Sequence, residues 1–381
     1  MDRVVEDAVV RSTSNRAQRL YWAGVTGMQH VDVVVVGAGA MGSATAWWLA
    51  RRGRSVALVE QFAQGHARGS SHGASRIFRY AYADPRYVRM VQAALPLWRE
   101  LEDDADTTLL EITGGVDHGV PALVAPVASA VAACGVEHAH LTAAAAHERW
   151  PGMRFEGGVV HCPGAGRCLA DATVRALQHR AAAHGADVRF STGPATLDWT
   201  DDRVHVRAGG DEWTAPAAVV TAGAWLPAVL GSRASLPPVR VTRERIQHFT
   251  PRPRSAPPAS EWPSFIHHRP DAWRYGLVSP GEGVKVAEHM TGPATDPSDD
   301  PPGEPDPVAA DRVRRYVEDW LPGLEPVPMH PATCLYTTTP TEDFVLERRG
   351  PVVIGSACSG HGFKFTPLVG RILADHAMSF G

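Results

Sequence analysis

The chain has 381 residues and a formal net charge of −4 at pH 7, and 44% of its residues are hydrophobic. At about 100 to 200 residues per domain this length indicates two domains, and the composition excludes a mostly disordered chain. The charge leaves no excess of cations that could neutralise a phosphate backbone, so we expect no nucleic acid partner.

No apolar run approaches the roughly 20 residues that cross a bilayer, and the N-terminus lacks the apolar core of a signal peptide. We therefore expect a cytoplasmic protein with no membrane partner. The five cysteines are spaced irregularly, as Cys134, Cys162, Cys168, Cys334 and Cys358. This spacing indicates reduced thiols and not a disulfide framework. We expect no metal site, because Cys162 and Cys168 have no matching second pair and His267 and His268 have one carboxylate, Asp271, nearby in the sequence.

Residues 1–27 fit no motif, and we treat them as an N-terminal extension. Residues 30–61 predict an apolar strand, a glycine turn, a helix and a second apolar strand that ends at Glu60. Gly37, Gly39 and Gly42 form a GxGxxG motif in that turn, where backbone amides can approach a pyrophosphate at the positive end of a helix. A tight packing turn is the alternative reading.

Glu60 strengthens the nucleotide interpretation, because it lies 23 residues after Gly37. At the end of the second strand its carboxylate can accept hydrogen bonds from an adenosine ribose. An acidic residue there argues against a 2′-phosphate, but it does not separate NAD from FAD.

The remaining elements follow in chain order. Residues 170–190 predict a helix closed by Gly185 and then a strand, and residues 196–225 predict a hairpin followed by an apolar strand. Proline-rich loops between 227 and 330 flank strand-like segments, which is typical of surface loops around an antiparallel sheet. A last helix is expected to pack on the core, with Thr366 as its N-cap and Pro367 at its first position.

Six short motifs carry a resemblance that runs from about residue 30 to the C-terminus. They are, in order, GAGAMGSATAWWLARRG, GSSHGASRIFR, VVTAGAW, GVKVAEH, CLYT and SGHGFKFTPLVG. In this order they resemble the monomeric sarcosine oxidase and N-methyltryptophan oxidase family, within the D-amino acid oxidase superfamily. The resemblance implies FAD bound covalently through a cysteine thioether to the flavin 8α-methyl group, and Cys334 occupies that position. From the residues alone, a buried structural thiol is the default reading of Cys334.

The resemblance also implies the fold class, which is α/β. We expect an FAD-binding Rossmann-like domain with a parallel sheet, and a substrate domain built on a mainly antiparallel sheet. The expected FAD-binding domain is discontinuous and comprises residues 28–86, 150–226 and 331–381. The expected substrate domain comprises residues 87–149 and 227–330.

The segment GSSHGASRIFR contains His72, Arg76 and Arg79. A loop rich in serine and glycine can wrap a ring system closely and present guanidinium groups to anions, although a solvated basic loop is also possible. The resemblance implies that Arg79 binds the substrate carboxylate, that Arg76 lies beside the flavin and that His72 lines the same cavity.

Two lysines can each be interpreted either as a residue of the site or as an ordinary solvated side chain. Lys364 precedes the last predicted helix, where it can face an anion, and Lys285 alternates with Val284 and Val286, so its side chain points away from theirs. The plain readings are a surface lysine and an outward, solvated lysine. The resemblance implies that Lys364 joins Arg79 on the substrate carboxylate and that Lys285 assists O2, since a cation stabilises developing superoxide charge.

Three further residues match the family's substrate site. His289 projects to the same strand face as Lys285, and the resemblance places it with Tyr336 and Tyr275 around the substrate. A core histidine is the competing reading of His289. The sequence between 276 and 284 departs from the family's glycine-aromatic pattern, which leaves the identity of the substrate open.

The expected catalytic residues are Lys285, Arg76, His72 and His289, and the expected substrate-binding residues are Arg79, Lys364, Tyr336 and Tyr275. The expected cofactor-binding residues are Gly37, Gly39, Ala40, Met41, Gly42, Glu60, Ser71, His72, Arg76, Cys334, Gly360, Gly362, Phe363 and Lys364.

These expectations define an oxidase that transfers hydride from the carbon next to a secondary amine of an amino acid-like substrate to FAD, with O2 as acceptor, giving an imine and hydrogen peroxide. A monomer is compatible with the resemblance. An oxidase of a cyclic imino acid or of a specialised-metabolite amine is the nearest alternative. An NAD-dependent dehydrogenase and a non-enzymatic flavin-binding or electron-transfer protein are alternatives of other classes.

Overall fold

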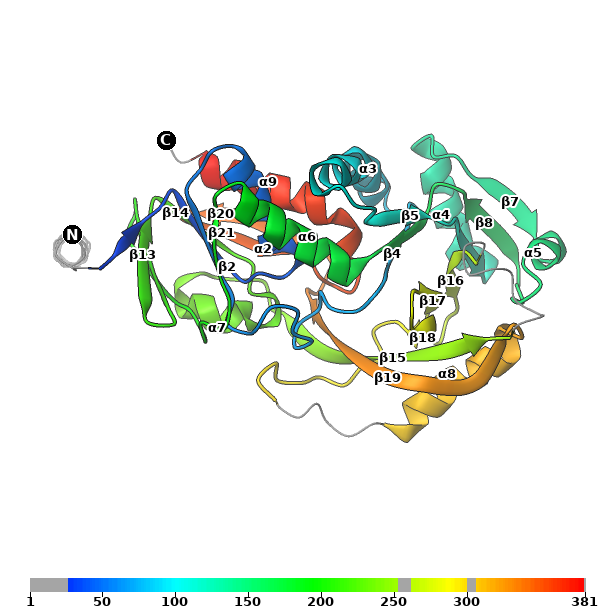
Figure 1. Ribbon diagram of the computed structural model, residues 1–381. Helices are drawn as coiled ribbons and strands as arrows, with labels where there is room; N and C mark the ends of the chain where they lie inside the picture. The colour runs from blue at the N-terminus through cyan, green and yellow to red at the C-terminus, as the bar shows by residue number, and fades with distance from the viewer. Residues whose placement is uncertain (1–26, 253–261, 300–305, 380–381) are drawn as a thin grey trace, which may run out of the picture.

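The computed structural model of the chain describes residues 27–252, 262–299 and 306–379 (Figure 1). Nearly all of the predicted N-terminal extension and parts of both proline-rich stretches lie outside the described residues. Within them, none of the helices combines the length and the apolar character needed to cross a membrane.

A six-stranded sheet forms one end of the molecule, and five of its strands are parallel. The sixth, β20, pairs antiparallel with its neighbour β21. In spatial order the strands are β10 (Asp187–Arg189), β3 (Val56–Val59), β2 (Val33–Val36), β14 (Ala217–Val220), β21 (Val352–Ser356) and β20 (Val345–Arg349).

Strand β2 consists of four buried valines, and successive side chains of a strand point to opposite faces of the sheet. Val33 and Val35 pack with the helices on one face, whereas Val34 and Val36 pack with a second, smaller sheet on the other. The helices are α2 (Ala40–Arg51), α6 (Ala170–Ala183) and α9 (Thr366–Met378), which lie side by side (Figure 1). An apolar run without alternation is what a strand covered on both faces requires.

The smaller sheet has four strands, β1 (Gln29–His30), β13 (Asp211–Ala215), β12 (Val204–Ala208) and β11 (Thr196–Trp199). The predicted hairpin is confirmed as β11 to β13, which pair antiparallel. Three short helical segments follow β14, namely η1 (Gly223–Trp225), α7 (Leu226–Leu230) and η2 (Gly231–Arg233).

An eight-stranded, mainly antiparallel sheet forms the other end of the molecule, with one parallel pair, β16 and β6. In spatial order its strands are β19 (Leu324–Thr338), β15 (Arg240–Pro251), β18 (Gly283–Glu288), β17 (Arg274–Ser279), β16 (Ser264–His268), β6 (Gly115–Gly119), β8 (Gly158–Cys162) and β7 (Ala139–Thr142). Helix α8 (Pro307–Trp320) buries Val313 and Val317 against it.

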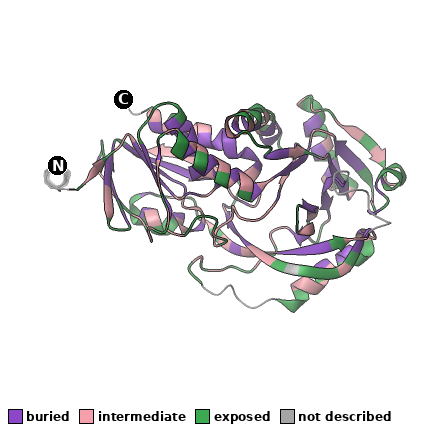
Figure 2. Ribbon diagram, viewed as in Figure 1, coloured by how far each residue is buried: buried purple, intermediate pink, exposed green. Residues whose placement is uncertain are grey.

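Some of the remaining elements pack between the two ends, and others pack on β6, β7 and β8 of the eight-stranded sheet (Figure 1). These elements are the helices α3 (Pro85–Ala105), α4 (Pro121–Ala133) and α5 (Ala143–Arg149), the 3-10 turn η3 (Phe363–Phe365), and a small sheet of β4 (Arg76–Phe78), β9 (Gly166–Cys168) and β5 (Leu110–Ile112). Buried residues dominate the central strands of both large sheets, whereas exposed residues occur along β19 and on the outer turns of α3 and α6 (Figure 2).

The predicted fold class is confirmed, since parallel and antiparallel sheets occur in one α/β chain. The division into two domains stays a prediction, and β19 runs across its predicted border at residue 331. The predicted cap of the last helix is wrong. Thr366 is the first helical residue, and its hydroxyl donates to the Phe363 carbonyl at 2.6 Å and does not accept from the helix.

Candidate active site

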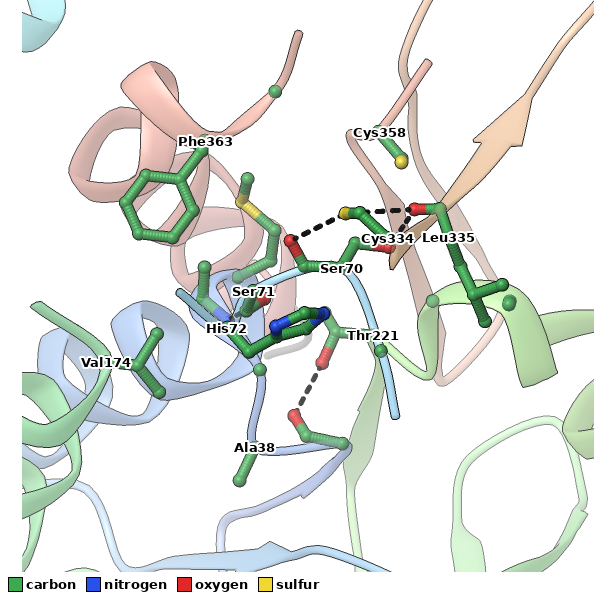
Figure 3. A pocket seen from close by; sticks show the side chains of 18 of the residues that line it. Ala38, Ser70, Ser71, His72, Val174, Thr221, Cys334, Leu335, Cys358 and Phe363 are labelled. Carbon is green, nitrogen blue, oxygen red and sulfur yellow. Dashed lines mark hydrogen bonds between the residues drawn. The ribbon is translucent and has the colours of Figure 1, made fainter. Parts of the chain in front are cut away.

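A cavity of about 560 Å³ runs from the turn between β2 and α2 to the strands β17, β18 and β19. Its walls therefore come from both large sheets and from the loop that precedes β4. Figure 3 shows His72, Cys334 and Phe363 around this space. All but one of the residues expected from the sequence line it, the exception being Gly42.

The turn between β2 and α2 can close only with glycine at two positions. Gly37 has a φ of +98°, and a Cβ atom there would lie 2.7 Å from the Thr221 carbonyl oxygen. A Cβ atom on Gly42 would lie 1.8 Å from the Gly37 carbonyl oxygen, so Gly42 packs beneath the turn and not on the cavity wall. This close packing aims the N-terminus of α2 into the cavity, where it can attract an anion.

Glu60 is buried at the cavity wall directly after β3. One carboxylate oxygen accepts from the Ala38 amide at 2.8 Å and the other from the Phe62 amide at 3.0 Å. These bonds fix the carboxylate beside the glycine turn, which is the geometry that a ribose hydroxyl pair requires.

Arg76 joins the loop before β4 to β19. Its guanidinium donates to the carbonyl oxygens of Ser75 at 2.8 Å and Ser70 at 3.0 Å, and it lies 3.8 Å from the Cys334 sulfur. The neighbouring His72 has a buried Nε2 atom without a hydrogen-bond partner in the described structure. Burial, followed by the charge of Arg76, lowers the pKa of His72 to about 4, so this ring is neutral at pH 7.

Cys334 lies on β19 and is buried against the cavity. Its sulfur is 3.7 Å from the carbonyl oxygen of Ser70, and the side chain of Cys358 lies nearby (Figure 3). Burial raises the pKa of the Cys334 thiol, whereas Arg76 and Lys285 act to lower it. The cations near Cys334 are those that favour a reactive thiolate.

The chain contains two lysines, and both are in this cavity. Lys285 and Lys364 are each only 4% exposed, which excludes the surface and solvated readings of both. The Lys285 ammonium donates to the Ser75 carbonyl at 2.6 Å, and burial, followed by Arg76, lowers its pKa to about 7. Burial and then Arg79 lower the pKa of Lys364 well below its usual value.

Tyr82 holds both of the cations that were expected to bind a carboxylate. Its hydroxyl accepts from the Lys364 ammonium at 2.8 Å, and the guanidinium carbon of Arg79 lies 4.1 Å from its ring centroid. Arg79 and Lys364 line the cavity, whereas Tyr82 supports them from behind. The sequence interpretation missed Tyr82, although its position three residues after Arg79 is a signal that could have suggested it.

An aromatic wall faces these cations. The ring centroids of His289 and Tyr336 are 5.7 Å apart, and those of His289 and Tyr275 are 6.5 Å apart. Trp273, which the sequence interpretation missed, stacks on His289 at 6.2 Å. Its alternation with Tyr275 and Leu277 along one strand face was the available signal, since all three line the cavity. Burial, followed by the charge of the nearby Arg79, lowers the pKa of His289 to about 4.

His267 and His268 lie away from the cavity, each paired with a carboxylate that is distant in the sequence. His267 bonds Glu156 at 2.7 Å, and His268 bonds Asp117 at 2.7 Å. The sequence had suggested Asp271 as the nearby carboxylate, so these partners were missed. Among the residues that the structure describes, no three His, Cys, Asp or Glu side chains gather in a way that could hold a metal ion.

Comparison with known proteins gives a consistent result. The model of the family DAO, FAD dependent oxidoreductase, matches residues 32–376. The monomeric sarcosine oxidase of Bacillus sp. (strain NS-129) is 31% identical over 91% of this chain and 93% of the relative. The peroxisomal sarcosine oxidase of Homo sapiens is 32% identical over 91% and 92%. The structure of NikD, an unusual amino acid oxidase essential for nikkomycin biosynthesis, has a TM-score of 0.82 and 27% identity over 93% of this chain and 95% of that chain.

Proposed function

Because the chain belongs to the family of FAD-dependent oxidoreductases, we propose that it is an oxidase of the sarcosine oxidase type. It would oxidise the carbon next to the secondary amine of an amino acid and produce an imine and hydrogen peroxide. Membership of this FAD-dependent family excludes the alternative of an NAD-dependent dehydrogenase. The observation that carries the proposal is the pair of cations, Arg79 and Lys364, which stand together at one end of the cavity.

The residues around the cavity fit FAD. The glycine turn leaves no room for a Cβ atom on Gly37, Glu60 offers a fixed carboxylate, and the buried Nε2 of His72 can meet a polar group of the ligand. The residues that would hold FAD are Gly37, Gly39, Ala40, Met41, Glu60, Ser71, His72, Arg76, Gly360, Gly362, Phe363 and Lys364. When bound, FAD supplies the acceptor for hydride and the route for electrons to O2.

The side chains of this protein would bind and orient the substrate. Arg79 and Lys364 would take its carboxylate, and the aromatic wall of Tyr275, His289 and Tyr336 would pack against the rest. Buried cations make an ammonium substrate costly, so they favour the neutral amine whose nitrogen lone pair promotes hydride loss. Lys285 would stabilise the negative charge that develops on O2.

Peroxide release tests the function. We expect release with some among sarcosine, N-methyltryptophan, L-proline and L-pipecolate, and loss of most activity in Arg79→Met because the carboxylate loses a charge-assisted partner. If the protein oxidises none of these carboxylated amines, the proposed binding of a substrate carboxylate by Arg79 and Lys364 is wrong. Tight flavin binding without peroxide from any amine would favour a non-enzymatic flavin-binding protein.

A cyclic imino acid is the second candidate substrate. The sequence leaves it open, because residues 276–284 were interpreted as a departure from the glycine-aromatic pattern of the family. The likeness to NikD, an unusual amino acid oxidase essential for nikkomycin biosynthesis, supports the related alternative of a specialised-metabolite amine. A larger kcat/KM for L-proline or L-pipecolate than for sarcosine would support this candidate. A cytoplasmic location and a monomeric state remain predictions from the sequence.

Cys334 would carry the covalent link to FAD. Its sulfur lies in the cavity between Arg76 and Ser70, where a thiolate gains support from nearby cations. In Cys334→Ser we expect flavin to be released on acid precipitation, whereas Cys358→Ser should retain it. Mass spectrometry of the peptide that contains residue 334 is the measurement. A covalent flavin that persists in Cys334→Ser would contradict the assignment.

A further inference from the structure

The turn between β17 and β18 reaches back into the cavity wall through a chain of side chains. Ser279 donates its hydroxyl to the Glu282 carboxylate at 2.6 Å, and Ser75 donates its hydroxyl to Ser279 at 3.0 Å. Both serines are at most 1% exposed, whereas the Glu282 side chain is 41% exposed. This series of hydrogen bonds therefore connects a carboxylate at the surface with the loop before β4, which lines the cavity.

Ser75 is the point at which this chain meets the cations of the site. Its carbonyl oxygen accepts from the Lys285 ammonium at 2.6 Å and from the Arg76 guanidinium at 2.8 Å. The two cations on this oxygen repel each other. Because the Lys285 ammonium donates to the Ser75 carbonyl, the position of that carbonyl determines where the ammonium lies. The Ser75 hydroxyl is fixed through Ser279, which restrains the carbonyl of the same residue.

Charged and titratable groups face Lys285 from every side. They are His72 and Arg76 on the loop before and at the start of β4, Cys334 on β19, Asp171 on α6, His248 on β15 and Glu282 on the turn. Burial is the largest influence on the pKa of Lys285 and lowers it, and Arg76 adds to this effect. Glu282 acts in the opposite direction and raises it. Near pH 7 the charge on Lys285 is therefore sensitive to Glu282.

We propose that Glu282 is a positioning residue which, through Ser279 and Ser75, places the Lys285 ammonium in the cavity and stabilises its charge for the reaction with O2. This inference rests on the proposed role of Lys285, and it gives a function to the turn between β17 and β18. Lysine suits this role because its ammonium can lose a proton near neutral pH when buried, which arginine does not do.

Nuclear magnetic resonance provides a direct test, since protein labelled with 13C at the lysine ε-carbon has two lysine signals, assigned with Lys285→Met. In the flavin-loaded protein we expect the Lys285 titration to move to lower pH by roughly half a unit in Glu282→Gln, because the charge of a half-exposed carboxylate is partly screened by solvent. Glu282→Lys should move it further in the same direction. Glu347→Gln is the matched control, because Glu347 is similarly exposed at 39% and lies on β20.

The two half-reactions provide a second test. As the pH rises, the rate of oxidation by O2 should begin to fall at a lower pH in Glu282→Gln than in the unchanged protein. The rate of anaerobic reduction by substrate should stay the same. Ser279→Ala removes two hydrogen bonds, the one to Glu282 and the one from Ser75. It should slow the O2 reaction by at least about fivefold at pH 7 and should also leave reduction unchanged. A purely structural role would slow both half-reactions alike and leave the Lys285 titration in place, and either result would overturn the proposal.

The variant Lys285→Met separates this inference from the proposed function. If Lys285→Met slows the O2 reaction but Glu282→Gln does not shift the Lys285 titration, the role of Glu282 fails and the role of Lys285 stands. If Lys285→Met leaves the O2 reaction unchanged, the proposed role of Lys285 fails, and with it the reason for Glu282. The Glu282 variants change a half-exposed side chain, so the test stands even if Ser279→Ala does not fold.

Discussion

Lysine is scarce in this protein, and its placement carries information. The chain has 37 lysine and arginine residues, and only Lys285 and Lys364 are lysines. Arginine therefore supplies nearly all the positive charge of the surface, whereas the lysines are reserved for the cavity. A guanidinium stays charged under all ordinary conditions, but a buried ammonium can be tuned by its neighbours. The lowered pKa of both lysines agrees with a tuned site.

Tyr82 allows a residue-scale prediction about the carboxylate clamp. Tyr82→Phe removes the hydroxyl that accepts from Lys364 and keeps the ring beneath Arg79. We expect the dissociation constant for acetate, measured from the flavin spectrum, to rise about fivefold, because a hydrogen bond contributes a net ~1 kcal/mol. The rate of anaerobic reduction at saturating substrate should change little.

The neighbouring Tyr87 supplies the control for this prediction. Its ring stacks on Tyr82 with centroids 5.3 Å apart, and its hydroxyl donates to Asp343 at 3.0 Å, away from the clamp. Tyr87→Phe therefore removes a hydroxyl from the same aromatic cluster without touching either cation. If it weakens acetate binding as much as Tyr82→Phe does, the specific role of Tyr82 is wrong.

At the scale of elements, the contact between α2 and α9 sets the position of the glycine turn. Gly370 of α9 lies against Ala44 of α2, and a Cβ atom there would be 2.5 Å from the Ala44 Cβ. The helices therefore pack closely behind the cavity, and Leu373 and Val369 fill the core around this contact. The sequence predicted that the last helix packs on the core, but it did not predict this close approach.

Gly370→Ala tests which of two effects decides stability. Helix propensity alone would stabilise the protein by about 1 kcal/mol, whereas overpacking costs roughly 1–3 kcal/mol. Because the clash involves the Ala44 backbone as well as its Cβ, we expect a net loss of stability, seen as a lower urea midpoint. Gly158→Ala is the control, since a Cβ atom at Gly158 meets nothing within 4 Å. A raised midpoint in Gly370→Ala would show that the helices move apart freely.

At the scale of the whole molecule, histidines are buried in both halves of the structure. Burial lowers the pKa of eight histidines from 6.5, namely His66, His72, His118, His161, His205, His267, His289 and His361. The value falls to about 4 for His161 and to about 3 for His361. These rings stay neutral in the folded protein under conditions in which an unfolded chain binds protons.

This difference predicts sensitivity to acid. A lowered pKa contributes stability that is fully present above pH 6.5 and is lost as the pH falls toward about 4, because the unfolded state then binds more protons. We expect the melting temperature to fall steeply between pH 6.5 and 4.5. Between pH 7 and 8 it should rise, because the lowered pKa of Lys285 and of Lys364 leaves fewer protons on the folded protein than on the unfolded chain. A melting temperature that stays constant down to pH 5 would contradict the prediction.

The sequence by itself determined the nucleotide-binding unit and the chemistry of the site. Four consecutive valines, a glycine turn and Glu60 are local patterns, and each specifies its own backbone geometry. The residue types of the cavity were also predictable, because they occur in short motifs, and the structure brings His72, Arg79, Lys285, Cys334 and Lys364 to one cavity.

Only the tertiary structure decided which distant side chains meet. Ser75 and Ser279 bond each other across 204 residues, and His267 and His268 take their carboxylates from Glu156 and Asp117. These contacts depend on the register of strands paired across the large sheet and on the packing of a loop against it. Local patterns set the face to which a side chain points, but the partner it meets depends on how separate elements pack.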